Sequence, residues 1–339
     1  MRRFYLVTLP QSFASGVLGA KDLLTAGARL LAHGDAGDAG GRLPFATELV
    51  GATRRVETTF GPPLDMDRVL AETGPADVVY ISPLAFMPEN EPRYDPALLK
   101  WLRAQHAAGA VVCAACTGTL PLAASGLLDG LPATTHWAYT ELFRRNHPTV
   151  DLDPRRTLIA GGTDYRLVTA GAHASWYDLM LYLIHRFSGA ATARRLARLF
   201  LLDWHELDQN AYASFRDERQ HGDAAVQEAQ QWFRANLSHP EPVEAAIAAS
   251  GLSARSFHRR FRQATGHTPI QYVQRVRVEH AKDRLESADE SVEAVAWRVG
   301  YEDVAHFRRL FRRLTGLAPG QYRKAFRTPP NIAEQLPAG

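Results

Sequence analysis

Hydrophobic and polar positions follow strand and helix periodicities in turn over about the first 190 residues. Runs typical of strands lie at 4–9, 78–82, 110–114, 158–160 and 167–169. Helical patterns separate them, near 15–31, 65–73, 95–108, 117–125 and 173–187. Because strands and helices alternate, we expect a parallel sheet with helices on both faces, a three-layer α/β fold of the flavodoxin-like kind.

Strand signals disappear beyond about residue 190. A helix is predicted over 191–204, a polar linker over 208–223, and helices from there on. Residues 34–41 are all Gly, Asp or Ala, which predicts a flexible surface loop. The tail from Thr328 has no periodicity, so we expect it to be disordered.

An internal repeat organises the helical part. Segment 261–272 matches 311–322 at an offset of 50, with Phe, Arg, Thr, Gly, Pro, Gln and Tyr in register. Two copies are too few for a solenoid and indicate a duplicated small module. Each copy predicts a helix-turn-helix unit, with paired helices at 242–249 and 254–264, then at 291–299 and 303–314.

The turn and cap residues of both units suit this interpretation. Gly251 and Gly300 lie in the turns, where glycine adopts a left-handed backbone without steric cost. Ser253 and Asp303 are good N-caps for the second helices. We therefore expect each second helix to begin directly after its cap.

Each second helix has an apolar face and a basic face. Two Phe residues four positions apart share the apolar side. The other side carries Arg255, His258, Arg259 and Arg262 in the first unit, and His306, Arg308, Arg309 and Arg312 in the second. An α-helix fits the major groove of DNA, where Arg reads guanine through two hydrogen bonds. A plain all-α bundle with a charged surface is the alternative.

Charge is concentrated at this end of the chain. Residues 251–327 hold 16 Lys and Arg against 8 Asp and Glu, a net charge of +8, which leaves −5 on the rest of the +3 chain. A polyanion would therefore be attracted to one end, although solvated basic helices also produce such a bias.

Residues 226–325 resemble the AraC/XylS family of DNA-binding domains, most clearly at 251–261, 265–272, 296–302 and 319–322. The resemblance implies an all-α domain in which a long helix, here about 270–286, joins two helix-turn-helix units. It implies double-stranded DNA as a partner, read in the major groove at direct-repeat half-sites. It also adds Val304 and Ala305 to the base-reading candidates; both are apolar and suit a thymine methyl group at most.

The N-terminal part contains a strand, a sharp turn and a helix over 111–120, with Cys116 at the turn. A helix N-terminus lowers the pKa of a thiol, so this position suits a nucleophile. Segment 124–137 resembles the class I glutamine amidotransferase-like (PfpI-like) domain that precedes an AraC-type reader in the GlxA group of regulators. The resemblance covers about 3–195 and implies an effector site containing Asp22, Cys116, Thr117, His136 and Gly171.

Catalysis at Cys116 lacks an expected partner. Peptidase-like members of the superfamily place His directly after the elbow Cys, and here the position is Thr117. We therefore expect a pocket that has lost catalysis and binds a small effector. Cys113 and Cys116 spell C-x-x-C, but a zinc site needs two further ligands, so neither a metal nor a cofactor is expected.

The sequence thus predicts an effector-sensing and dimerisation domain over 1–195, a helical linker over 196–224, a DNA-binding domain over 225–326 and a disordered tail over 327–339. The resemblance implies an amino acid or quaternary amine as effector, and a homodimer; RNA polymerase is a further candidate partner. The alternatives are a cysteine-dependent amidase or deglycase with an appended DNA module, and an architectural DNA binder without a ligand. Without an apolar run of membrane length or a signal peptide, and with two cysteines, we expect a cytoplasmic protein.

Overall fold

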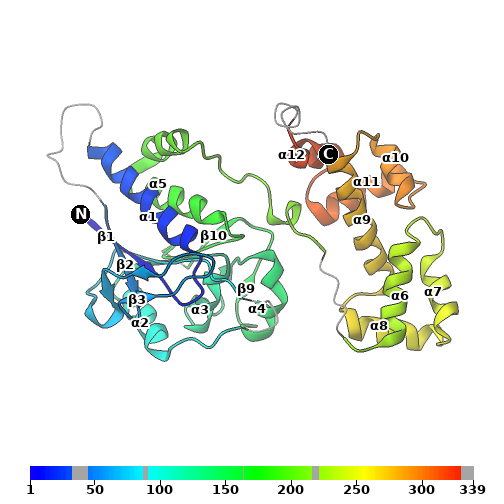
Figure 1. Cartoon of the computed structure of the whole chain (residues 1–339), viewed down its shortest axis with the longest axis horizontal. Helices are drawn as coiled ribbons and strands as arrows, with labels where there is room; N and C mark the ends of the chain where they lie inside the picture. The colour runs from blue at the N-terminus through cyan, green and yellow to red at the C-terminus, as the bar shows by residue number, and fades with distance from the viewer. Residues whose placement is uncertain (33–44, 87–90, 163, 216–220, 330–339) are drawn as a thin grey trace. The chain divides into compact units, whose positions relative to one another are not determined.

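The computed structural model describes residues 1–32, 45–86, 91–162, 164–215 and 221–329. The chain divides into two compact units, Met1–Gln209 and Asn210–Gly339, and each is described by itself (Figure 1). The predicted loop at 34–41 and residues 330–339 of the predicted tail lie outside the described residues. The division falls inside the stretch predicted as a linker.

The first unit is built on a seven-stranded sheet formed by its described residues, in the order β10-β11-β7-β6-β1-β2-β5. Its pairs are parallel except at one edge, where β10 runs antiparallel to β11. The prediction of an all-parallel sheet is wrong there. The strands are β1 (Arg2–Val7), β2 (Phe45–Gly51), β5 (Arg68–Val69), β6 (Val78–Ile81), β7 (Val111–Ala115), β10 (Leu158–Gly161) and β11 (Leu167–Ala170).

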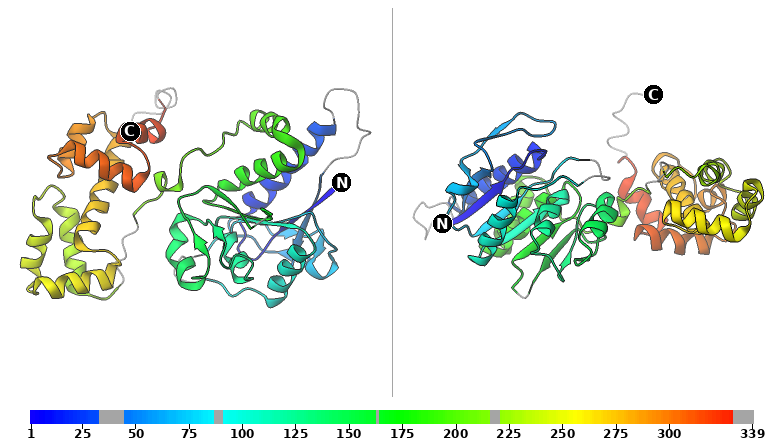
Figure 2. Two further views of the ribbon diagram at one scale, coloured as in Figure 1. Left: turned by 180° about the vertical axis from the view of Figure 1, so that it is seen from behind. Right: turned by 90° about the horizontal axis from the view of Figure 1, so that it is seen from below.

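Helices cover both faces of this sheet, which confirms the three-layer α/β fold. Helices α1 (Ala14–Ala32) and α5 (Ser175–Leu199) lie side by side on one face (Figures 1 and 2). Helices α2 (Pro96–Ala107) and α3 (Thr119–Ala124) pack on the other. Successive side chains of β1 divide between the two cores: Phe4 and Leu6 face α1 and α5, whereas Tyr5 and Val7 face the opposite layer.

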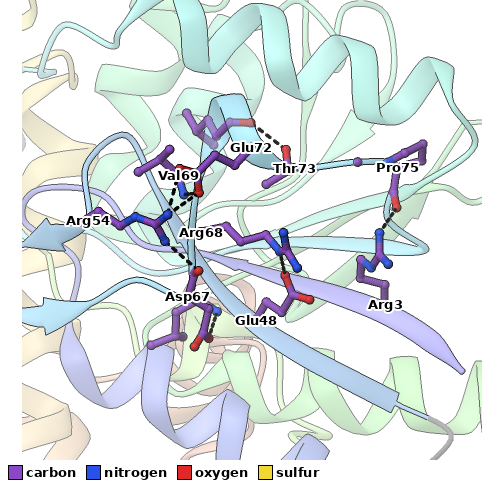
Figure 3. Close-up of polar contacts among 12 residues, drawn as sticks. Arg3, Glu48, Arg54, Asp67, Arg68, Val69, Glu72, Thr73 and Pro75 are labelled. Atoms are coloured by element: carbon purple, nitrogen blue, oxygen red, sulfur yellow. Dashed lines mark hydrogen bonds and ion pairs between the residues drawn. The ribbon is translucent and has the colours of Figure 1, made fainter.

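The helix predicted over 65–73 is wrong. Residues 68–69 pair with β2, whose strand over 45–51 the sequence pattern did not reveal. The Asp67 carboxylate accepts a hydrogen bond from the Leu49 backbone at 2.7 Å, and both carboxylate oxygens of Glu72 bind Arg54, at 2.8 and 2.7 Å (Figure 3). Contacts with a neighbouring strand therefore override the local helical pattern, and charged side chains protect the sheet edge.

The helix predicted over 191–204 ends early. It continues α5 across a kink at Gly189, whose φ is 81°, and stops at Leu199. Shorter elements complete the unit: β3 (Arg55–Val56), β4 (Leu64–Asp65), β8 (Pro132–Ala133), β9 (Asp151–Leu152), α4 (Thr140–Asn146), and the 3-10 turns η1 (Leu70–Glu72), η2 (Cys116–Gly118) and η3 (Trp137–Tyr139). The 3-10 turn η4 (Gln209–Ala211) spans the boundary between the two units.

The described part of the second unit contains seven α-helices, which confirms an all-α domain. The central helix α9 joins two hydrophobic clusters: Tyr272 and Val276 near its start belong to one, and Ala281 and Leu285 near its end belong to the other. Figure 1 shows α8 and α11 at opposite ends of α9. The helices are α6 (Ala224–Ala235), α7 (Pro242–Ser250), α8 (Ala254–Thr265), α9 (Pro269–Ser287), α10 (Val292–Arg298), α11 (Val304–Thr315) and α12 (Pro319–Phe326).

Candidate DNA-binding face and effector site

The caps and turns of both helix-turn-helix units form as predicted. The Ser253 hydroxyl accepts a hydrogen bond from the Ser256 backbone, and the Asp303 carboxylate accepts from two backbone groups at the start of α11. The turns contain Gly251 and Gly300, with φ of 64° and 85°. At Gly300 a Cβ atom would also lie 2.5 Å from the Leu237 carbonyl oxygen, so this turn excludes any side chain.

The sequence repeat produces the same aromatic contacts twice. In α8, Phe261 meets Tyr272 of α9 edge to face, with ring centres 5.3 Å apart. In α11, Phe311 meets Tyr322 of α12 at 5.4 Å in the same manner. These four side chains are buried, which fixes the apolar face of each second helix against its own core.

The opposite faces of α8 and α11 are exposed and basic. Nine of the ten predicted contact residues are exposed: Arg255, His258, Arg259, Arg262, Ala305, His306, Arg308, Arg309 and Arg312. Val304 differs, because it is half-buried and packs on the core of the second unit. A groove of about 540 Å³ is lined by residues including His258, Arg259 and Arg262. The assignment of individual DNA contacts stays a prediction.

Not every arginine of these helices belongs to this face. Arg260 makes a bidentate ion pair with Asp223, at 2.8 and 2.7 Å, and so joins α8 to the start of α6. Arg308 pairs with Glu293 at 2.5 Å, but both side chains are about half exposed. An exposed pair of this kind is weak, so Arg308 can exchange its partner for a phosphate at small cost.

The elbow at Cys116 exists, with a strained backbone. Cys116 has a φ of 57°, in the left-handed region, directly after β7. Its carbonyl oxygen accepts hydrogen bonds from Thr119 Oγ1 at 2.7 Å and from Thr135 Oγ1 at 3.1 Å. Thr117 Oγ1 accepts from the backbone N–H of Leu84 at 2.8 Å and binds the Leu84 carbonyl oxygen. These threonines hold the turn in place.

The thiol at the elbow is not activated. The Cys116 side chain is 3% exposed, and burial raises its pKa to about 11 despite hydrogen bonds from Thr117 that favour the thiolate. The expected lowered pKa of Cys116 is therefore wrong, because desolvation by burial outweighs the hydrogen bonds from Thr117. Cys113 is fully buried in β7 and donates to the Val79 carbonyl oxygen, so burial raises its pKa as well.

The other predicted effector-site residues have different environments. Asp22 is exposed on α1, and His136 uses Nδ1 to accept from the Ala138 backbone at 3.0 Å. Gly171 is buried against the side chain of Gln209. Sequence reasoning missed Gln209, which belongs to no recognisable motif. It also did not single out Thr134 and Thr135, although both lie in segment 124–137.

A second feature of this unit is a cavity of about 300 Å³. Its lining includes Asp178, Tyr182, Trp204 and His205. Asp178 is 3% exposed and accepts hydrogen bonds from the backbone and, at 2.6 Å, from the ring of His205. The described residues include no group of three or more His, Cys, Asp and Glu side chains arranged to hold a metal ion.

Two families match the two units. Residues 52–186 match the DJ-1/PfpI family, and residues 247–325 match a helix-turn-helix domain. The chain is a DJ-1/PfpI domain joined to an AraC-type helix-turn-helix domain. A protein from Vibrio parahaemolyticus described as a transcriptional regulator has 20% identity over 59% of this chain and 98% of its own, with a TM-score of 0.51, a likeness that shows the fold.

Curated relatives share both parts. The transcriptional regulator GbdR of Pseudomonas aeruginosa is 26% identical over 66% of this chain and 60% of its own length. The transcriptional regulator GlxA of Rhizobium meliloti is 27% identical over 61% of this chain and 63% of its own. The chain thus spans less than two thirds of each. None of the helices in the described ranges combines the length and apolar character that a bilayer crossing requires.

Proposed function

We propose that this chain is a sequence-specific DNA-binding transcription regulator whose DJ-1/PfpI domain binds a small metabolite. The observation that carries the proposal is the duplicated basic face of α8 and α11. In both helices the phenylalanines are buried and an arginine between them, Arg259 or Arg309, is exposed, as insertion into the major groove requires. The names of the relatives support the same function.

The two faces suit two segments of one duplex. Arg259 and Arg309 are offset by the length of the repeat, so each takes the same position in its own unit. Either side chain can read guanine through two hydrogen bonds, whereas arginines nearer the helix ends, such as Arg312, contact phosphate. We further propose that a homodimer binds direct-repeat half-sites, since a second copy raises the local concentration of DNA-binding domains.

The environment of Cys116 favours a sensor over an enzyme. A nucleophilic thiol needs a thiolate and access to substrate, and this thiol is buried with a raised pKa. We therefore assign the first unit to effector binding without turnover. An effector changes DNA binding only to the extent that it favours one conformation over another.

Selection of bound sequences from a pool of random duplexes tests the proposal. We expect the full chain to enrich one sequence, and to bind it roughly 1,000-fold or more tightly than a scrambled duplex. The double variant Arg259→Ala/Arg309→Ala should lose this preference. Arg55→Ala/Arg144→Ala removes the same charge from exposed positions of the first unit and should retain the preference. Failure of the wild-type chain to enrich any sequence would refute the proposal.

A further inference from the structure

Gln209 is a polar residue of the interdomain stretch that is nevertheless buried. Its side chain is 2% exposed, and its backbone N–H donates to the Arg155 carbonyl oxygen at 2.6 Å. The carboxamide nitrogen lies 3.1 Å from Thr134 Oγ1, 3.0 Å from the Thr135 carbonyl oxygen and 2.9 Å from the Arg156 carbonyl oxygen. The residue therefore occupies a polar site in the first unit, which we call the Gln209 seat.

The hydrogen-bonding capacity of a carboxamide does not match this seat. An amide nitrogen carries two hydrogens, but three oxygen atoms surround it. The carboxamide oxygen of Gln209 is buried and has no hydrogen-bond partner among the described residues. The Thr134 hydroxyl itself donates to the Arg156 carbonyl oxygen at 2.8 Å, so the two amide hydrogens suffice for the other two acceptors. The carboxamide oxygen, in contrast, is desolvated without compensation. An N–H donor group without a carbonyl would leave no unsatisfied oxygen in the seat.

The seat is connected to the predicted effector site. A Cβ atom on Gly171 would lie 2.2 Å from the Gln209 amide nitrogen, so the two residues are in tight contact. Thr135, whose carbonyl oxygen faces Gln209, donates its hydroxyl hydrogen bond to the Cys116 carbonyl oxygen. The seat thus contacts Gly171 directly and is linked to Cys116 through Thr135.

The chain is also anchored just beyond the seat. The second unit begins at Asn210, and within that unit the buried Lys282 ammonium donates to the Ala213 carbonyl oxygen at 2.6 Å. Gln209 and Ala213 are four residues apart, so the junction is held by its own domain on each side. Loss of the Gln209 contacts would lengthen the untethered segment between the units.

We propose that the Gln209 side chain is an internal occupant of a binding site for a small primary ammonium compound, which displaces it and frees the junction. Three N–H donors of such a compound match the oxygens of Thr134, Thr135 and Arg156, and these replace the water that the cation loses on entry. A quaternary amine has no N–H donor and does not fit. The link from the freed junction to DNA binding rests on the proposed function, whereas occupancy of the seat does not.

Hydrogen exchange of the full chain tests the displacement, with ethylammonium chloride as the probe. We expect ethylammonium to raise the exchange rate of the Gln209 amide at least 10-fold, because its hydrogen bond to Arg155 is lost. Tetramethylammonium chloride at equal ionic strength should have no effect. Unchanged exchange at saturating ethylammonium, or an equal response to both salts, would overturn the proposal.

Two variants test the seat: one displaces the Gln209 side chain, and the other removes it. Gly171→Ala places a methyl group where the Gln209 side chain lies, so the Gln209 amide should exchange faster without any probe. Gln209→Ala removes the competitor, so ethylammonium should bind several-fold more tightly than to the wild type. Weaker binding to Gln209→Ala, in a variant whose other regions exchange normally, would contradict competition.

Gln105 provides the matched control. It is also buried, but its amide oxygen accepts from the Ala76 backbone at 2.9 Å and its amide nitrogen donates to the Gly74 carbonyl oxygen at 3.0 Å. Gln105→Ala should change neither the exchange of the Gln209 amide nor the affinity for ethylammonium. A separate titration with the selected duplex distinguishes the two hypotheses. A chain that responds to ethylammonium but selects no DNA refutes the proposed function and retains the seat.

Discussion

The guanidinium carbon of Arg277 lies 5.1 Å from the centre of the Tyr301 ring. Arg277 belongs to α9, and Tyr301 lies in the turn of the second helix-turn-helix unit. The same guanidinium donates to the carbonyl oxygens of Leu237 and His239, which precede the first helix-turn-helix unit, at 2.8 Å each. Within the second compact unit, one buried side chain therefore connects the two helix-turn-helix units.

Replacement of Arg277 should lower the free energy of unfolding. Arg277→Ala leaves two carbonyl oxygens without their charged donor and removes the contact with Tyr301. We expect a loss of about 2–4 kcal/mol in the free energy of unfolding, measured by urea denaturation. Arg277→Lys should not rescue it, because a single ammonium cannot reproduce the forked geometry. An unchanged free energy of unfolding in the alanine variant would show that the packing of the two helix-turn-helix units does not depend on Arg277.

The buried thiols predict a specific response to alkaline pH. Burial raises the pKa of Cys116 to about 11, whereas an unfolded thiol titrates near about 8.5. The contribution of the protonated Cys116 thiol to the free energy of unfolding is therefore complete below about pH 8.5. It is lost as pH rises toward 11, because only the unfolded state releases the proton in that range. Cys116→Ser should show a shallower fall in stability across this interval in pH-dependent denaturation.

Alkylation of the native chain checks the same claim without unfolding it. At pH 8, iodoacetamide should modify neither Cys113 nor Cys116 until denaturant is added, because both are buried and protonated. DNA affinity of Cys116→Ser should equal that of the wild type. Rapid native alkylation at Cys116 would instead favour the cysteine-dependent enzyme.

Salt dependence should separate phosphate contacts from base contacts. Arg312 is exposed near the end of α11, a position suited to the DNA backbone. Arg312→Ala should weaken binding to specific and scrambled duplexes alike, and reduce the slope of log K against log salt by about 1. Fluorescence anisotropy over a salt series measures this slope, and Arg144→Ala should leave it unchanged. A loss confined to the specific duplex would identify Arg312 as a base contact.

The second unit could be predicted closely because its signals are local and occur twice. The repeat aligned Phe261 with Phe311, and the caps at Ser253 and Asp303 marked the start of α8 and α11. Turn glycines, caps and helical periodicity each depend on neighbours within a few residues. Arg260 was omitted from the predicted contacts, and the structure commits it to Asp223.

The errors lie where distant contacts decide the outcome. The pattern at 65–73 is helical in isolation, but residues 68–69 pair with β2 as the edge strand of the sheet. The sequence places Cys116 at an elbow, but it does not show how deeply the thiol is buried. Gln209 resembles any residue of a polar linker, because the oxygens that hold it come from segments more than 50 residues away.

The central claim is that α8 and α11 enter two successive major-groove segments of one duplex. Missing-contact footprinting on the selected sequence tests it most directly, with wild type, Arg259→Ala and Arg309→Ala. We expect two protected groups of guanines, roughly 10 base pairs apart, as one helical turn requires. Arg259→Ala should remove contacts in one group and Arg309→Ala in the other, each at a cost of about 1–3 kcal/mol. A single protected segment, or a pattern that neither substitution changes, would contradict the account.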